Sequence, residues 1–448
     1  MSTRRRNVIL ILSDQMQYRR QGRLDPESST PHLDGLAEAG VDFSHCFVSN
    51  PQCTPSRTSL LTGLHPHEAG VMTNYGFFDH AGHVDDTHDT VGQAFARAGY
   101  RTAYFGKSHL GFPLQRLGYD VVEDHGGVVG GLAEVDRSIA ADACDFIRSA
   151  PPDRPFFLTV SFHEPHPPFE LVPGFEPAQE SFARPASMRD PLDGRPEFQL
   201  RRQRSDEGVM TEGRYDDEVR RYLSMIAHLD SLVGDVVAGV REAGAWDDTV
   251  VAFTSDHGDL MGAHGMRLKG TLPYDELFRV PLIVKGAGSP DLGVVDDLVS
   301  NVAIPATLLD LAGVTRTGAW HARSRLPMPS LVAAGSGEAA PEMVFAQHYA
   351  AYWGVHPFRL VRTREWKLVQ YYGPDRSLEL YDLRSDPSEQ RNVVDEPDHA
   401  DVVASLAGAL DSWWVATGGR DFDYYESEGF RRAGASDLLD DNVKWAMT

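Results

Sequence analysis

Residues 51–64, PQCTPSRTSLLTGL, are the segment from which the architecture of this chain can be inferred. They place Cys53 directly before a helix-forming run that Gly63 can end. Pro55 suits the first position of a helix, because its missing N–H has no partner there. We therefore expect Cys53 at a helix N-terminus, where the positive end of the helix dipole favours a thiolate or another oxyanion. Arg57 falls about one turn later, close enough to point back toward Cys53.

Cys53 has a second interpretation, a small buried thiol before a structural helix, because free cysteines are among the most buried residue types. The C-x-P-x-R pattern alone is weak, since background residue usage produces it in roughly one chain in a hundred of this length. The choice depends on whether the rest of the chain supplies matching chemistry.

Length and charge limit the classes of function. The 448 residues are 42% hydrophobic and 24% charged, so we expect one large globular domain and one smaller one. The 42 basic residues face 65 acidic ones, a net charge of −23, which argues against nucleic acid or an anionic membrane as a partner.

The cysteine count and the apolar runs bear on the compartment. Three cysteines, Cys46, Cys53 and Cys144, form no disulfide framework and favour a reducing compartment. The first apolar run, Val8–Leu12, is too short for a secretory signal. No apolar run approaches ~20 residues, so nothing is expected to span a membrane. We expect a cytoplasmic protein.

Apolar, strand-like runs alternate with amphipathic, helix-like segments over the first three quarters of the chain. This alternation predicts an α/β fold with a large, mainly parallel sheet sandwiched by helices. The expected strands are Val8–Leu12, Tyr100–Phe105, Phe156–Phe162, Val250–Thr254 and Val280–Lys285. The expected helices are His32–Ala39, the Cys53 helix, Thr90–Ala98, Val135–Ser149, Glu218–Ala243 and Ile304–Ala312.

From about Met343 the pattern changes to short strands separated by turns. We place a large domain at residues 1–342 and a smaller α+β domain at residues 343–448. Its expected strands are Met343–Tyr349, Arg359–Arg364, Trp366–Tyr372 and Leu378–Leu383, with a helix over Asp398–Thr417. The last thirty residues are expected to form a tail that packs on the main body.

Residues Pro173 to Arg214 show no periodicity and are expected to form an excursion over the surface. Their arginines have two interpretations, contact with an anionic sugar or a solvated surface loop, of which we favour the loop. These arginines are Arg184, Arg189, Arg195, Arg201, Arg202 and Arg204.

Four polar clusters each come directly after an expected strand. Ligands of open α/β sheets bind outside the carboxyl ends of the strands, so these clusters predict one shared site that Cys53 joins. The clusters are Ser13-Asp14-Gln15, Gly106-Lys107-Ser108-His109, His163-Glu164-Pro165-His166 and Ser255-Asp256-His257-Gly258.

Asp14 and Asp256, with the adjacent Gln15 and His257, predict a divalent-cation site. Carboxylate and amide oxygens suit calcium or magnesium, and His257 shifts the balance toward manganese or zinc. Each motif alone is also consistent with a turn or a helix cap. Their pairing across two strand ends favours the metal.

Several cationic or proton-donating side chains follow the same strands. In a chain of net charge −23, these groups are suited to hold a tetrahedral oxyanion and to protonate a leaving group. A solvated or hydrogen-bonded side chain is the alternative for each, and only one of the two histidines in His163-Glu164-Pro165-His166 needs to face the site. The candidates are Lys107, His109, His163, His166 and Lys269.

Cys53-Thr54-Pro55-Ser56-Arg57 followed by Thr62-Gly63 resembles the signature of the type I sulfatases, which belong to the alkaline-phosphatase-like superfamily. Further segments resemble family blocks in family order, so the similarity covers nearly the whole chain. They are Asn7–Gln15, Gly106–Gly111, Ser161–Phe169, Thr254–Gly258, Lys269–Val284 and Leu380–Leu383 with Asp386-Pro387 and Asn392. The resemblance implies an alkaline-phosphatase-like fold whose catalytic domain is residues 1–342.

The resemblance also implies a mechanism. Cys53 would be oxidised by a formylglycine-generating enzyme to Cα-formylglycine, whose hydrate supplies the nucleophile. A divalent metal, most simply Ca²⁺ with Mg²⁺ or Mn²⁺ as alternatives, would lower the pKa of that nucleophile. By position, the metal ligands would be Asp14, Gln15, Cys53, Asp256 and His257.

The resemblance implies further roles for the charged residues around the nucleophile. Arg57 would orient the diol, and Lys107 and Lys269 would bind the sulfate oxygens. His109 would be the diol-side base, and His166 would be the partner of the leaving-group oxygen.

Two departures from the common sulfatase pattern bear on the substrate. Many sulfatases carry Asp-Asp where this chain has Asp14-Gln15, and Asn where it has His257; the Gln and His versions also occur in phosphonate monoester hydrolases. We expect hydrolysis of a small-molecule or carbohydrate sulfate ester, with a phosphonate or phosphate mono- or diester as the alternative substrate. A non-catalytic binding protein is the third hypothesis, and the intact Cys53 and cation set argue against it.

Overall fold

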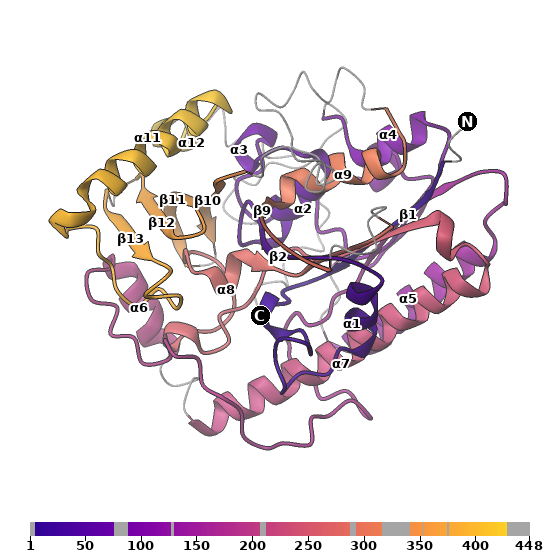
Figure 1. Ribbon diagram of the computed structural model, residues 1–448, viewed down its shortest axis with the longest axis horizontal. Helices are drawn as coiled ribbons and strands as arrows, with labels where there is room; N and C mark the ends of the chain where they lie inside the picture. Colours follow the sequence, from indigo (N-terminus) through magenta and orange to yellow (C-terminus); the bar gives the residue numbers. More distant parts are fainter. Residues whose placement is uncertain are drawn as a thin grey trace.

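The computed structural model describes residues 5–75, 88–126, 130–206, 212–286, 293–315, 341–351, 353–373 and 376–427. Figure 1 shows a large sheet with helices on both faces and, beside it, a smaller sheet with its own helices. The predicted fold class is therefore confirmed.

The large sheet has the strand order β4-β3-β5-β1-β6-β8-β2-β7, with β9 paired to β2. Its parallel part consists of β4 (Val121–Asp124), β3 (Arg101–Gly106), β5 (Phe156–Ser161), β1 (Asn7–Ser13) and β6 (Thr249–Ser255). The carboxyl ends of these strands therefore share one edge. The remaining strands are β8 (Leu282–Lys285), β2 (Gly40–Phe47), β7 (Arg279–Val280) and β9 (Gly293–Ser300); β8 is antiparallel to β6 and β2, β7 is antiparallel to β2, and β9 is parallel to β2.

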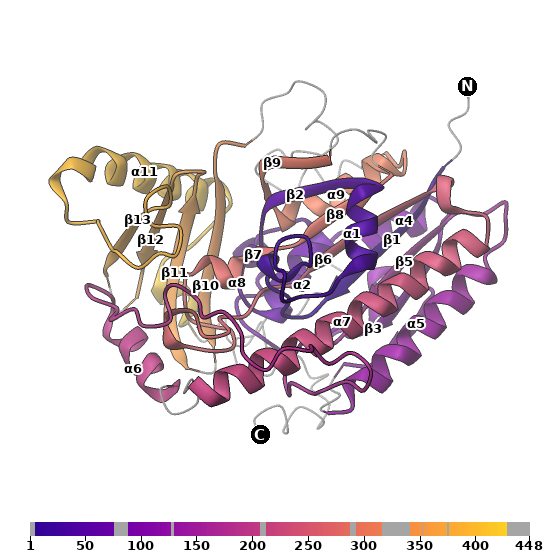
Figure 2. The same ribbon diagram turned by 60° about the horizontal axis from the view of Figure 1, so that its bottom comes forward.

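Both faces of the large sheet are buried, which explains the continuous apolar runs of its central strands. In β1, Val8 and Leu10 join the hydrophobic cluster on one face, while Ile9 and Ile11 join the cluster on the other. Helices α2 (Cys53–Thr62), α4 (Val91–Arg97) and α9 (Ile304–Leu311) pack in the first cluster. Helices α1 (Pro31–Glu38), α5 (Leu132–Arg148) and α7 (Glu212–Glu242) pack in the second, and Figure 2 shows α5 and α7 side by side along that face.

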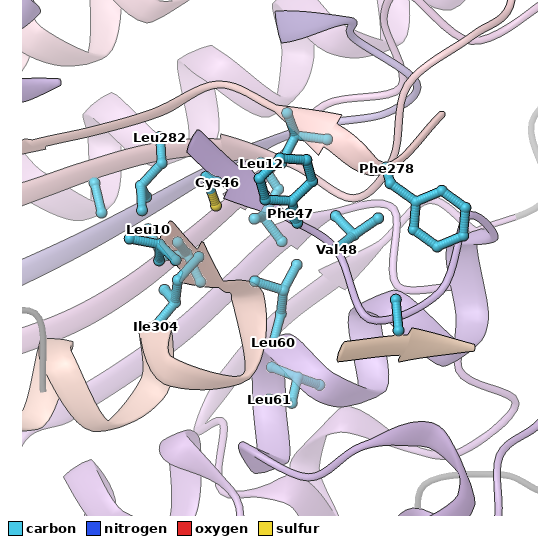
Figure 3. Packing of buried hydrophobic residues seen from close by; sticks show 14 of the residues in the cluster. Leu10, Leu12, Cys46, Phe47, Val48, Leu60, Leu61, Phe278, Leu282 and Ile304 are labelled. Atoms are coloured by element: carbon cyan, nitrogen blue, oxygen red, sulfur yellow. The ribbon is translucent and has the colours of Figure 1, made fainter. Parts of the chain in front are cut away.

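Helix α2 is held in the core over its whole length. It begins at Cys53 and ends at Gly63, whose φ of 65° is the left-handed conformation that a glycine adopts at little cost, as predicted. Pro55 is the third helical residue rather than the first. Figure 3 shows Leu60 and Leu61 of this helix in the same apolar layer as Leu10 and Leu282 of the sheet. This packing fixes the position of Cys53 relative to the strand ends.

The smaller sheet is antiparallel, with the order β10-β11-β12-β13. Its strands are β10 (Val344–Ala351), β11 (Gly354–Arg362), β12 (Trp366–Tyr371) and β13 (Leu378–Asp382). One face packs against the large domain. The other packs on α11 (Ala400–Ala416) through Leu410, Trp413 and Trp414, and on α12 (Phe422–Tyr425) through Tyr425. Of the predicted tail, residues 428–448 lie outside the described residues.

Several elements differ from the sequence-based expectation. Strands β2, β4 and β9 were not predicted; β2 reads GVDFSHCF and buries the polar Asp42 and Ser44. The expected strand Val280–Lys285 is split at Pro281 into β7 and β8, since proline cannot donate a ladder hydrogen bond. The remaining short elements are α3 (Pro66–Ala69), α8 (Asp275–Phe278) and the 3₁₀ turns Tyr18–Arg20, Leu114–Leu117, Trp246–Asp248, Ala263–Gly265, Asn301–Ala303 and Pro397–His399.

The expected surface excursion is wrong in part. It contains a helix, α6 (Glu197–Asp206), and two of its arginines are buried rather than solvated. Arg195 pairs with Asp190 at 3.3 Å, and Arg202 pairs with Asp206 and donates to the Arg267 carbonyl at 2.6 Å. Both ion pairs are local, and the segment is held to the rest of the protein by the Arg202 hydrogen bond and by that of Arg195 to the Glu389 carbonyl at 2.7 Å, which local sequence does not reveal.

Helix α7 includes a stretch, Arg214–Glu242, that is long and apolar enough to cross a membrane by length and composition. In the described part of the chain it is the one helix with this property. Its apolar window is 67% buried, and it packs against α1 and α5. Burial against its neighbours accounts for its composition as a core helix.

Candidate active site

The candidate site lies at the shared carboxyl edge of the large sheet. Asp14 follows β1, Lys107 follows β3, His166 follows β5 shortly after its end, and Asp256 follows β6. The N-terminus of α2 brings Cys53 to the same place. The structure therefore gathers side chains from all four predicted clusters, although the chemical role of each residue stays a prediction.

Cys53 lies fully buried in an electropositive environment. Its Sγ atom is 2.8 Å from Lys269 Nζ and 3.3 Å from His257 Nε2. Burial and the Asp14 carboxylate raise the pKa of the Cys53 thiol, but Lys269, Lys107 and His257 outweigh them, so the pKa lies well below its ordinary value. This environment stabilises an anion at the position of Sγ.

A group of possible metal ligands surrounds the same atom. Ligand atoms of Asp14, Cys53, Asp256 and His257 all lie within 4.8 Å of one another. Asp14 Oδ1 and Gln15 Oε1 are buried and accept no hydrogen bond. Buried acceptors without a donor are costly, whereas oxygen ligands beside them suit a hard divalent cation. The donor set therefore fits such an ion, and the predicted role of Gln15 as a further ligand stays a prediction.

The conformation of Gln15 is unusual and is held by specific hydrogen bonds. Its φ of 74° is left-handed, a strain that non-glycine residues show most often at functional sites. Its backbone N–H donates to Asp256 Oδ1 at 3.1 Å, and its side-chain amide donates to Asp259 Oδ2. These bonds leave Gln15 Oε1 available beside the carboxylates.

Arg57 connects the two acidic strand ends. Its Nε donates to Asp256 Oδ2 at 2.8 Å and its Nη2 to Asp14 Oδ2 at 2.9 Å, while Nη1 donates to the Lys107 carbonyl and to Ser161 Oγ, both at 2.7 Å. The guanidinium is 1% exposed. In this geometry Arg57 positions both carboxylates, and its predicted contact with the nucleophile is electrostatic rather than a hydrogen bond.

The two lysines and His166 complete the cationic side of the site. Lys107 forms an ion pair with Asp14 Oδ2, and Lys269 Nζ is 3.8 Å from Asp14 Oδ1. His166 donates from Nδ1 to the Pro167 carbonyl at 2.7 Å. Burial, reinforced by Lys107 and Lys269, lowers the pKa of His166 to about 3. His166 is therefore a neutral imidazole that presents Nε2 without a proton.

The other two candidate histidines are placed differently. His109 is in a left-handed conformation with φ 52°, its carbonyl accepts from Thr54 Oγ1 at 2.8 Å, and its buried Nδ1 has no hydrogen-bond partner. His163 has a structural role, because its two ring nitrogens form hydrogen bonds with Asp136 Oδ1 at 2.9 Å and with the His125 carbonyl at 3.0 Å. Of the two histidines after β5, it is His166 that lies beside Cys53.

Three supporting residues escaped the sequence analysis. Asp259 accepts from Gln15 and from the backbone of Leu268 at 3.1 Å, which links the metal-ligand group to the Lys269 loop. Ser161 binds Arg57, and Asn74 Oδ1 accepts from the Thr54 N–H at 3.0 Å at the start of α2. The signals were the position of Asp259, two residues after His257, and that of Ser161 at the start of the family-like segment Ser161–Phe169.

Comparison with protein families agrees with this geometry. The Sulfatase family model matches residues 6–314, and the model for the C-terminal region of N-sulphoglucosamine sulphohydrolase matches residues 262–414. The first match spans well over half of the chain. This protein belongs to the sulfatase family, the sulfuric ester hydrolases of the alkaline-phosphatase-like superfamily.

Individual relatives are similar over nearly their whole length. The choline-sulfatase of Rhizobium meliloti is 28% identical, over 89% of this chain and 84% of its own. The Delta 4,5-hexuronate-2-O-sulfatase of Bacteroides thetaiotaomicron is also 28% identical, over 91% and 88%. In structure, the phosphonate monoester hydrolase of Agrobacterium radiobacter shares the fold with a TM-score of 0.75 at 22% identity, over 94% of this chain and 97% of its own.

Proposed function

We propose that this enzyme hydrolyses a sulfate ester to an alcohol and sulfate, with a nucleophile made from Cys53. The observation that carries the proposal is the setting of Cys53 Sγ, which lies 2.8 Å from Lys269 Nζ and beside buried acceptor atoms that lack donors. A nucleophile at this atom would meet a cationic face for the sulfate and a ligand set for a metal. Ordinary burial of a small thiol explains neither feature.

The proposed nucleophile requires a change at Cys53. Oxidation of its Cβ from thiol to aldehyde removes two electrons and releases the sulfur, so a formylglycine-generating enzyme with an oxidant must act. Because Cys53 is 0% exposed in the folded chain, we propose that this enzyme acts before folding is complete. The three thiols are free, which supports maturation and residence in a reducing, cytoplasmic compartment.

The hydrated aldehyde carries two hydroxyl groups at the former Sγ position. In the proposed reaction one hydroxyl oxygen bonds to the ester sulfur while the bond between sulfur and the alcohol oxygen breaks, and the alcohol takes a proton. The second hydroxyl then loses its proton, the C=O bond forms again, and the bond between carbon and the sulfate oxygen breaks. Water rehydrates the aldehyde. We propose His109 as the base for this second hydroxyl.

Lys107 and Lys269 are proposed to bind the sulfate oxygens, because both ammonium groups border Asp14 and Cys53. His166 is proposed to serve the leaving-group oxygen. It is neutral in the free enzyme. An anionic substrate bound beside the two lysines would raise the pKa of His166, so that Nε2 becomes protonated and can donate this proton to the leaving-group oxygen. Arg57 would keep the two carboxylates in place throughout.

We propose that Asp14, Gln15, Asp256 and His257 hold a divalent cation next to the residue derived from Cys53. When bound, the cation would lower the pKa of the attacking hydroxyl and screen the charge of the ester. The oxygen atoms of Asp14, Gln15 and Asp256 support Ca²⁺, and the His257 nitrogen keeps Mg²⁺ and Mn²⁺ as alternatives. The unpartnered Asp14 Oδ1 and Gln15 Oε1 are the structural support for this assignment.

We propose a small-molecule or carbohydrate sulfate as substrate, since the two relatives named above act on a choline ester and a hexuronate. A phosphonate or phosphate ester is the second candidate. Gln15 and His257 make the ligand set less anionic than an all-carboxylate one, which favours a more highly charged substrate on Coulomb grounds. Tight binding alone does not accelerate the chemical step, so the sulfate ester stays first.

The test compares kcat/KM for matched nitrophenyl sulfate and phenylphosphonate esters on aldehyde-bearing enzyme. We expect faster turnover of the sulfate. A phosphonate preference above about tenfold, roughly 1.4 kcal/mol of transition-state binding, would reverse the ranking. A set of sugar sulfates run in parallel shows whether contacts remote from sulfur are needed for turnover.

A further inference from the structure

A cavity lies at the seam between the large domain and the C-terminal sheet. Its volume is about 220 Å³, and none of its lining residues belongs to the candidate active site. Tyr18 contributes from the turn after β1, Arg279 from β7, and Arg362 from the end of β11. Arg19 and Arg364 also line it. Four arginines around one cavity are notable in a chain of net charge −23.

The arginines of this cavity are not all neutralised. Arg279 donates from Nε to the Ser44 carbonyl at 2.8 Å and lies 4.1 Å over the Tyr18 ring, and among the described residues no carboxylate is within 4.0 Å of its guanidinium. Arg362 is 4% exposed, and its buried Nε has no hydrogen-bond partner. Buried donors without an acceptor are costly, so an acceptor from outside would be favourable.

Two of the four lining arginines have carboxylate partners. Asp275 accepts from Lys367 Nζ at 2.8 Å and from Arg362 Nη2 at 3.2 Å, and Asp296 pairs with Arg364. Arg19 and Arg279 are the two lining arginines for which the described residues provide no ion pair within 4.0 Å.

The pKa of His45 is lowered by burial and by the positive charge of the neighbouring arginines. Burial, with Arg279 and Arg362 acting in the same direction, lowers the pKa of His45 to about 4. The imidazole is therefore neutral near pH 7, and the positive charge of the cavity comes from the guanidinium groups alone.

We propose that this cavity binds a small oxyanion, sulfate or phosphate, free or carried on a small molecule. Guanidinium groups donate in a planar fork that matches the oxygens of such anions, and they stay charged at all relevant pH values. The Arg279 guanidinium is already oriented by Tyr18 and by the Ser44 carbonyl, so little side-chain entropy is lost on binding. The site goes beyond the hydrolysis reaction and does not depend on modification of Cys53.

The test is isothermal titration of sodium sulfate, and separately of sodium phosphate, into the full-length unmodified chain at constant ionic strength. We expect two classes of anion site in the wild-type protein. Arg279→Gln, and independently the exposed Arg19→Glu, should weaken one class by at least about tenfold, the usual cost of losing a charge-assisted contact. Arg148→Gln on α5 removes the same charge away from the cavity and is the matched control.

A Lys107→Ala/Lys269→Ala variant separates the cavity from the reaction site. It should retain the class of anion site that Arg19→Glu weakens. Unchanged binding in both cavity variants, with melting temperatures near that of wild type, would overturn the proposal. Loss of all binding in the double-lysine variant would overturn it as well. Titration with a phosphorylated sugar then distinguishes a carried oxyanion from a free one.

Discussion

Two buried clusters of charged side chains in this protein differ in how their charges are paired. The nucleophile cluster comprises Asp14, Gln15, Cys53, Asp256 and His257, and the seam cluster comprises Asp275, Arg362, Lys367 and Glu389. In the seam cluster each cation has a carboxylate partner. Lys367 lies between Asp275, at 2.8 Å, and Glu389, and Arg362 pairs with Asp275 at 3.2 Å through Nη2, although its Nε has no acceptor. Burial alone would raise the pKa of Asp275, but Lys367 and Arg362 hold it below its ordinary value.

The nucleophile cluster lacks this balance. Asp14 Oδ1 and Gln15 Oε1 accept no hydrogen bond, although Lys269 Nζ lies 3.8 Å from Asp14 Oδ1, and Gln15 adopts a strained left-handed backbone. Paired buried charges hold domains together, whereas unbalanced ones mark a place built for something that binds or reacts. Changes in the nucleophile cluster should therefore remove activity and spare the fold, and changes in the seam cluster should do the reverse.

The largest expected effect is that of Cys53→Ala. It removes the atom from which the nucleophile is made, so turnover of a sulfate ester should fall by at least about 10⁴-fold, as when other covalent nucleophiles are deleted. The melting temperature should change little. Cys46→Ala is the matched control, since Cys46 is a buried thiol of β2 in the hydrophobic core. Activity that survived Cys53→Ala would place the nucleophile elsewhere.

Removal of divalent metal should come next in size. Exhaustive chelation should lower kcat by at least about a hundredfold, because charge stabilisation by a catalytic metal is worth several kcal/mol. Added Ca²⁺ should restore kcat in the wild-type enzyme but not in Asp256→Ala. Full activity in protein shown by elemental analysis to be metal-free would refute the ligand assignment.

Lys367→Met should affect stability instead of chemistry. It leaves the buried Glu389 carboxylate without its cation and Asp275 with Arg362 alone, and removing one partner of a buried ion pair costs about 3–5 kcal/mol. Urea unfolding measures this loss, and kcat per folded molecule should stay within about twofold. Lys367→Arg, which keeps the charge, should recover part of the stability. A large fall in kcat with unchanged stability would contradict the division between the clusters.

His348 in β10 is a buried titratable group that lies in neither cluster. It is fully buried, and neither of its ring nitrogens has a hydrogen-bond partner. Burial, and then His356, lowers the pKa of His348 to about 3. The unfolded chain therefore binds a proton first as the pH falls below about 6.5, so this contribution to stability is complete above pH 6.5 and is lost toward pH 3.

At pH 5.5 the wild-type free energy of unfolding should be lower than at pH 7.5 by about 1.4 kcal/mol on account of His348 alone. His348→Phe should lack this part of the slope, which urea unfolding at the two pH values can measure. Identical slopes in the two proteins would show that His348 finds a partner when protonated.

Those features of the fold that arise from local sequence patterns could be predicted from the sequence. The apolar run of β1, the helix that begins at Cys53, and the polar clusters after four strands are local patterns, and the structure contains them all. Strand β2 was missed because it buries Asp42, which forms an ion pair with Arg23. Helix α6 was missed because tertiary bonds hold it, including that of Gln199 to Glu379 at 2.6 Å.

Within the site, sequence located the residues but not their partners. The position of Arg57 between two carboxylates and the support of Gln15 by Asp259 depend on strands that are distant in the chain. The division of labour between His163 and His166 likewise depends on Asp136 of α5. The spacing of residues in the sequence shows which side chains reach one edge of the sheet. Which of those side chains form hydrogen bonds with other side chains depends on the tertiary structure.

The central claim, that turnover depends on an aldehyde made from Cys53, is tested most directly by one titration. Protein produced with graded amounts of the maturation enzyme is analysed by peptide mass spectrometry at residue 53, and sulfate-ester turnover is measured on the same samples. We predict that turnover per molecule rises in proportion to the aldehyde fraction and extrapolates to zero at zero aldehyde. Full turnover in protein that carries only the unmodified thiol would contradict it.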